Sequence, residues 1–204
     1  PPYEPVVKLD VKRPLTFGAF AMPDTYHEIR YMLNRAMMNS KAVLEDAFKE
    51  FSETFGREYH PYYEEYRTED ADVILLTMGS LAGTVKEAVD RMRADGERVG
   101  VLKLRTARPW PSEELRKALD HASIVAVIEK DISLGHEGTV SSDLKAAYHR
   151  RDGPLVLSFV AGLGGRDVPV RDIVKTYEQA KATRDPVDGS LWVGLKEDII
   201  PEVR

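Results

Sequence analysis

Two turns of the chain carry residue types that bind anions. Arg105 and Arg108 lie in the segment RTARPWP, directly after an apolar run. Guanidinium groups pair with phosphates and carboxylates through forked N–H donors. Gly79, Ser80 and Thr84 follow an earlier apolar run, at a turn that would start a helix. Helix starts and the carboxyl ends of parallel strands bind anions, so we predict an anion site built from these five residues.

The same arginines also have a purely structural interpretation. In that alternative, Arg105 and Arg108 bridge to acidic neighbours, and Trp110 is buried beneath them. The sequence leaves both interpretations open.

A second set of polar residues follows a later apolar run: Glu129, Asp131, His136 and Glu137. These residue types serve as metal ligands and as acid–base groups, but their spacing matches no metal-binding motif. Hydrogen bonds that hold the glycine-bearing loop explain them better. We therefore assign no catalytic, cofactor-binding or metal-binding residue to this chain. One hypothesis for the function is a self-sufficient enzyme that uses the Glu129–His136 loop, and it is less favoured than the other hypotheses given below.

The apolar pattern places these residues on an α/β fold. Short apolar runs of the kind found in buried strands occupy 72–78, 99–104, 123–128 and 155–160. Amphipathic helices follow each run, as in Leu81, Val85, Ala88, Val89 and Met92. We predict an open, mostly parallel sheet with helices on both faces, and a right-handed first crossover. Ser80 and Ser112 are the predicted helix caps, and Pro169 the predicted first residue of the last helix.

The remaining segments flank that fold. We divide the chain into an extended arm, a long helix with its connector, the α/β domain, and a tail that docks on the domain or on a partner: 1–23, 24–70, 71–184 and 185–204. Within the tail, Leu191–Leu195 is a candidate edge strand.

The arm and the long helix are unusually apolar. Phe17, Phe20 and Met22 make the arm either a segment lying on its own domain or one that packs on a neighbour. The helix pattern starts at Asp24, with Thr25 and Glu28 at capping-box spacing, and stops at Gly56. Its methionines and aromatic residues recur at helical spacing, which favours packing against this domain or a partner over a cofactor site.

Composition narrows the classes of function. The chain has 204 residues, a formal net charge of −5 and no cysteine. Without a basic stripe, nucleic acid is not an expected partner. No apolar run is long enough to span a membrane, and no signal peptide is recognised. Lack of cysteine removes disulfides and cysteine-ligated clusters from this chain and fits the cytoplasm. Because it begins at Pro1, we expect a processed product or part of a larger protein.

Five stretches, in order, resemble one family. They are FGAFAMPDTYHEIRYMLNRAM, FGREYHPYYEEYRTEDADVILLTMGSLAGTVKEAVDRMR, KLRTARPWP, EKDISLGHEG and GLGGRDV. Together they resemble the C-terminal part of the alpha subunit of pyruvate:ferredoxin oxidoreductases, across essentially the whole chain. Trp110 stands where that family usually has Phe. The resemblance implies a transketolase C-terminal-like domain.

The resemblance also implies a parent complex. That complex oxidises pyruvate, transfers the acetyl group to coenzyme A and reduces ferredoxin, using thiamine diphosphate, magnesium and iron–sulfur clusters. In the family, the beta subunit binds the diphosphate and magnesium, and an iron–sulfur subunit carries clusters. This chain has no Gly-Asp-Gly motif and no cysteine. We therefore expect a structural and assembly domain, inactive alone, with no cofactor of its own.

Two further points stay open from the sequence. The alternative function is an anion- or nucleotide-phosphate-binding module with a ligand or regulatory role. The choice of 2-oxoacid and the oligomeric state, including a homodimer, are not decided by these residues.

Overall fold

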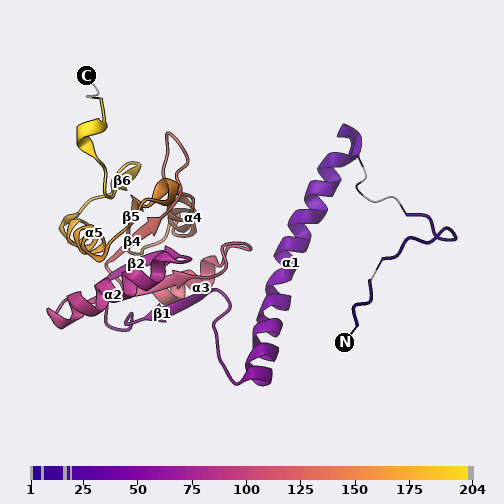
Figure 1. Cartoon of the computed structure of the whole chain (residues 1–204), viewed down its shortest axis with the longest axis horizontal. Helices are drawn as coiled ribbons and strands as arrows, with labels where there is room; N and C mark the ends of the chain where they lie inside the picture. Colours follow the sequence, from indigo (N-terminus) through magenta and orange to yellow (C-terminus); the bar gives the residue numbers. More distant parts are fainter. Residues whose placement is uncertain (1, 6, 16–17, 19, 202–204) are drawn as a thin grey trace. The chain divides into compact units, whose positions relative to one another are not determined.

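The computed structural model describes residues 2–5, 7–15, 18 and 20–201. The chain divides into two units, Pro1–Lys41 and Ala42–Arg204, and the boundary falls inside the first helix. Figure 1 shows the elements of both units. Phe17 belongs to the arm prediction but lies outside the described residues.

The larger unit contains a six-stranded sheet in the order β1-β3-β2-β4-β5-β6. Its strands are β1 (Tyr63–Tyr66), β2 (Val73–Met78), β3 (Val99–Leu104), β4 (Ile124–Glu129), β5 (Leu155–Val160) and β6 (Ser190–Trp192). The strands from β2 to β6 run parallel, and β1 pairs antiparallel with β3. The predicted open, mostly parallel α/β sheet is confirmed.

Helices cover both faces of the sheet, as predicted (Figure 1). They are α2 (Leu81–Ala94), α3 (Ser112–Leu119), α4 (Thr139–Ala147) and α5 (Val170–Ala182). One core cluster combines α2 and α5 with one sheet face, and a second combines α3 and α4 with the other. Alternate residues of β2 show this: Leu75 joins the first cluster and Leu76 the second, because successive strand side chains point to opposite faces.

Two edge strands extend the four that the apolar runs predicted. The candidate strand within Leu191–Leu195 is confirmed as β6, although it begins at Ser190. Strand β1 was missed, because the sequence YEEY was interpreted as part of a connector. It is an edge strand with only partly buried side chains, so it lacks the apolar run of a central strand.

The helix starts correct four details of the prediction. Ser80 holds the predicted cap position of α2, but it has helical dihedral angles and makes no side-chain capping hydrogen bond, whereas a capping residue is normally extended. Helix α3 already begins at Ser112, so Pro111 holds the cap position. Pro169 is likewise the cap of α5, which begins at Val170.

The fourth correction concerns α1, which spans Pro23–Phe55 rather than starting at Asp24. Proline suits the first helical position, since its missing N–H would lack a helical partner there. The Thr25 hydroxyl therefore lies inside the helix and donates to the Met22 carbonyl, 3.3 Å away. The predicted stop is confirmed: Gly56 follows the last helical residue with a φ of +66°.

Candidate functional site

A cavity of about 440 Å³ opens at the carboxyl ends of β2 and β4. These are the strands between which the chain order reverses, because β3 lies on the far side of β2 and β5 on the far side of β4. Open α/β sheets bind ligands at such a reversal point. We call this space the switch-point cavity and take it as the candidate site.

The wall of the switch-point cavity is mainly apolar. Its apolar members come from β2, α2, the loop after β3, β4 and α4: Leu76, Met78, Leu81, Ala107, Val127, Ile128 and Val140. The polar lining residues are Thr77, Arg108, Glu129, Lys130, Asp131, Thr139 and Asp143. The Thr77 hydroxyl donates to the Ile128 carbonyl at 2.9 Å, which ties β2 to β4 beneath the cavity.

Glu129 ends β4 and is only 6% exposed. Its carboxylate accepts hydrogen bonds from the Val140 and Ser141 backbone amides, at 2.8 and 3.1 Å, and from the Ser141 hydroxyl at 2.6 Å. Thus Glu129 occupies the amides at the start of α4, where a carboxylate also meets the positive end of the helix dipole.

The pKa of Glu129 reflects opposing effects. Burial, followed by a hydrogen bond with Asp131, raises the pKa to about 7, while the bonds from Ser141 and the α4 amides oppose that rise. The position of the Glu129 carboxylate also restricts which residue can occupy position 138 in the loop before α4. A Cβ added to Gly138 would lie 2.0 Å from Glu129 Oε1, so only glycine fits beside the carboxylate.

The other residues of the Glu129–Glu137 set also serve the loop. Glu137 pairs with Lys145 of α4, and its backbone carbonyl accepts from the Ser133 amide at 3.1 Å. His136 is exposed and lies 3.4 Å from the Ser142 hydroxyl. The interpretation that hydrogen bonds hold this loop is therefore confirmed. Among the described residues, no group of three or more His, Asp or Glu is placed to hold a metal ion.

The two predicted anion-binding arginines do not converge. Arg108 lines the switch-point cavity and pairs with Asp143 at 2.7 Å. Arg105 turns toward β1, where its guanidinium is 3.5 Å from Glu64 and 5.0 Å from the centre of the Tyr59 ring. Each arginine thus bridges to an acidic neighbour, as the structural alternative expected.

The predicted turn residues lie near the cavity without lining it. Gly79 has a φ of +71°, which lets β2 turn directly into α2, and both Gly79 and Ser80 are exposed. Thr84 is half-buried one turn further along the helix. Anion binding by the set of five therefore stays a prediction. Lys130 also lines the cavity but is absent from the predicted set, although its position directly after β4 was a usable signal.

The fold and its cavity define this unit as an open α/β domain of the doubly wound kind. The family model described as "Pyruvate:ferredoxin oxidoreductase core domain II" matches residues 71–173. The chain belongs to this family.

Curated proteins that are similar to this chain are named as subunits of pyruvate synthase and of ketoisovalerate oxidoreductase. The chain is 44% identical over 203 residues to pyruvate synthase subunit PorA of Pyrococcus abyssi, covering 97% of this chain and 51% of that protein. It is 41% identical over 183 residues to ketoisovalerate oxidoreductase subunit VorA of Pyrococcus horikoshii, covering 89% of this chain and 46% of that protein. The chain spans about half the length of the curated relatives it matches.

Solved structures show weaker similarity. A 2-oxoglutarate:ferredoxin oxidoreductase from Magnetococcus marinus aligns with a TM-score of 0.46 and 23% identity, covering 65% of this chain and 21% of that one. A split-gene transketolase aligns with a TM-score of 0.48 and 17% identity, covering 61% of this chain and 44% of that one. Among the described residues, no helix is long and apolar enough to cross a bilayer.

Proposed function

We propose that the chain is the C-terminal structural and assembly portion of the alpha subunit of a 2-oxoacid:ferredoxin oxidoreductase that acts on pyruvate. The parent complex would oxidatively decarboxylate pyruvate to acetyl-CoA and reduce ferredoxin. The observation that carries the proposal is membership of the core domain II family. Similarity to PorA subunits over 97% of the chain supports pyruvate as the substrate.

The complex would contain a thiamine-binding beta subunit and an iron–sulfur subunit, and would act in the cytoplasm. Its cofactors would be thiamine diphosphate, magnesium and iron–sulfur clusters. This chain has no thiol to ligate a cluster and no Gly-Asp-Gly motif of the kind that binds the diphosphate and magnesium in the family. The chain would therefore contribute surfaces rather than chemistry, and we expect no pyruvate oxidation by the chain alone.

The surface that supports an assembly role is the N-terminal part of α1. No residue of α1 is buried, although Tyr26, Leu33 and Met37 recur at helical spacing on it. These three side chains are 52%, 55% and 46% exposed. A row of large apolar side chains in water is typical of a surface that binds another protein. We propose that the subunits of the complex cover this row.

The test is assembly of the complete complex, with the full-length alpha subunit expressed beside its partner subunits. Met37→Lys places a charge on the row, and we expect it to lower the yield of assembled complex at least about fivefold, since an unpaired buried charge is costly. Met38→Lys is the matched control, because Met38 is also exposed (59%, against 46% for Met37) but lies about 100° further around the helix. Unchanged assembly of Met37→Lys, measured by native mass, would contradict the proposed surface.

A further inference from the structure

The switch-point cavity has the dimensions of a small-molecule site. Its volume of about 440 Å³ falls within the range of about 300–1,000 Å³ typical of ligand pockets. Its floor is formed by the ends of β2 and β4, and its sides by the start of α2, the start of α4 and the loop that holds Arg108. Five separate segments therefore contribute to a single hollow.

The carboxylates of the cavity already have partners within the chain. Asp143 is paired with Arg108 at 2.7 Å, and Asp131 is hydrogen-bonded to Glu129. Glu129 in turn accepts from the amides at the start of α4. A cationic ligand would have to compete with every one of these contacts.

Lys130 differs from these carboxylates. Within the described residues, no ion pair or hydrogen bond involves its ammonium group, and the residue is exposed. Its aliphatic stem lies beside Gly162 in the loop after β5, where an added Cβ would be 3.0 Å from Lys130 Cε. The stem is therefore supported against the protein, while the ammonium group is available to a ligand at the cavity.

Arg108 offers a second donor at the same cavity. Its side chain is 52% exposed although it pairs with Asp143, so an anion can approach the guanidinium from the solvent side. The five N–H donors of arginine allow it to hold two acceptors at once. Arg108 and Lys130 come from the loops after β3 and β4, and both line the cavity.

We propose that the switch-point cavity binds a small amphipathic anion: an apolar body of about aromatic-ring size that carries one phosphate or carboxylate. The body would lie against Met78 and Ala107, whose side chains are accessible at the cavity, and the anionic group would bind Lys130 and Arg108. This site differs from the predicted set of five anion-binding residues, because only Arg108 is common to both.

Phenyl phosphate is a suitable probe, with benzoate to distinguish carboxylate from phosphate. We expect phenyl phosphate to shift the backbone amide resonances of Met78, Lys130 and Thr139 when added to the ¹⁵N-labelled 204-residue chain. Inorganic phosphate lacks the apolar body and phenol lacks the charge. Each should bind at least about tenfold more weakly, because it retains one of the two recognition elements.

Two variants and one control test the residues. Lys130→Gln removes an exposed ammonium and leaves the core intact, and we expect about tenfold weaker binding of phenyl phosphate. Ala107→Phe places a ring in the part of the cavity where the apolar body would bind, and should weaken binding at least about tenfold. Arg105→Gln is the control, since Arg105 lines a different hollow together with Tyr59 and Glu64. The Arg105→Gln variant should bind phenyl phosphate as tightly as the parent chain does.

Specific outcomes would overturn the proposal. They are the absence of resonance shifts at 10 mM phenyl phosphate and benzoate, equal binding of phenol and phenyl phosphate, or unchanged binding by both Lys130→Gln and Ala107→Phe. A preference for either phosphate or carboxylate identifies the anionic group and supports the proposal. Failure here leaves the assembly role intact, because that role is tested through Met37 of α1.

Discussion

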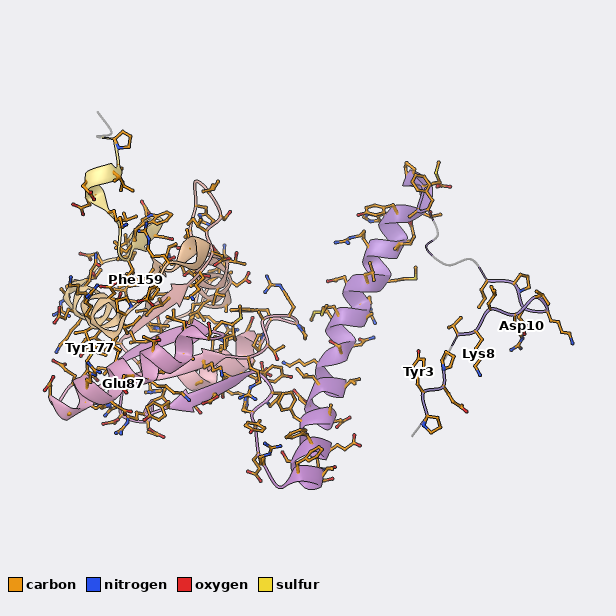
Figure 2. The ribbon with its side chains drawn as sticks, viewed as in Figure 1. Tyr3, Lys8, Asp10, Glu87, Phe159 and Tyr177 are labelled. Atoms are coloured by element: carbon orange, nitrogen blue, oxygen red, sulfur yellow. The ribbon has the colours of Figure 1, made fainter. Side chains whose placement is uncertain are left out.

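The two units of this chain treat their apolar residues in opposite ways. In the unit Ala42–Arg204, the sheet and its helices bury side chains such as Leu102 and Phe159 completely. Phe159 is labelled in Figure 2. In the unit Pro1–Lys41, Tyr3 and Phe20 are 87% and 86% exposed, and α1 buries none of its residues. The unit Ala42–Arg204 contains its own core. The unit Pro1–Lys41 consists of an arm and a helix segment, which cannot enclose a core.

The part of α1 that belongs to the larger unit sharpens this contrast. There, Phe51 lies 5.9 Å from the Tyr59 ring, and Arg105 lies over the Phe48 ring at 5.8 Å. Glu45 accepts a hydrogen bond from the buried Tyr62 hydroxyl at 2.5 Å. The segment after the helix thus partly covers Phe48 and Phe51, whereas Leu33 and Met37 stay exposed. Apolar residues at helical spacing therefore predict contact, without telling which molecule supplies it.

Matched leucine truncations should show the largest difference between the two units. Leu102→Ala deletes a fully buried side chain from β3, and we expect it to lower the free energy of unfolding by about 2–5 kcal/mol. Leu33→Ala, at a side chain that is 55% exposed, should change it by less than about 0.5 kcal/mol. Urea unfolding followed by circular dichroism measures both. A cost above 1 kcal/mol for Leu33→Ala would show that this residue is covered within the chain.

The sequence predicted the central part of the fold because buried parallel strands are nearly continuous apolar runs. Strands β2, β3, β4 and β5 follow those runs to within one residue at either end. Helix starts were less predictable, although Ser80 and Ser112 are both suitable capping residues. The backbone holds Ser80 in a helical conformation, and Ser112 lies one position too late, as the first residue of α3.

The missed strand also explains the misplaced arginine. Glu64 lies in β1, opposite Lys103 of β3, and this pairing brings its carboxylate within 3.5 Å of Arg105. Without β1, the sequence did not indicate which acidic residue would pair with Arg105, or that this pair would lie away from the cavity. Arg108 was predicted correctly as a residue at the carboxyl edge, because that required only the order of strands and loops. Predicting the position of Arg105 required its tertiary partner Glu64, whereas local sequence was sufficient to predict the position of Arg108.

The pH dependence of stability should come from the buried carboxyl group of the larger unit. Burial raises the pKa of Glu129 to about 7, from an ordinary value near 4.5. Between these values the folded state holds a proton that the unfolded state has lost, so the free energy of unfolding falls as pH rises. The contribution is fully present below pH 4.5 and lost above 7. Its slope is at most about 1.4 kcal/mol per pH unit.

Glu129→Gln isolates this effect, because it removes the titrating proton from the same position. His60 acts in the opposite sense: burial lowers its pKa, so it favours the folded state as pH rises. The quantity to measure is therefore the stability of the parent chain minus that of Glu129→Gln, by urea unfolding at pH 5.0, 6.0 and 7.0. We expect this difference to fall with pH. A constant difference would mean that the α4 amides keep Glu129 ionised throughout.

Two tyrosines provide the smallest and most closely matched comparison. The Tyr177 hydroxyl of α5 donates to Glu97 at 2.5 Å, and Tyr177, labelled in Figure 2, is 3% exposed. The Tyr31 hydroxyl of α1 accepts from Arg35 at 3.3 Å, and that residue is 59% exposed. Tyr177→Phe leaves the Glu97 carboxylate with one donor fewer and should cost about 1–2 kcal/mol. Tyr31→Phe should cost less than about 0.5 kcal/mol, because water replaces an exposed bond. Equal costs in chemical denaturation would show that the N-terminal helix segment contributes as much to the stability of this chain as the sheet and its helices.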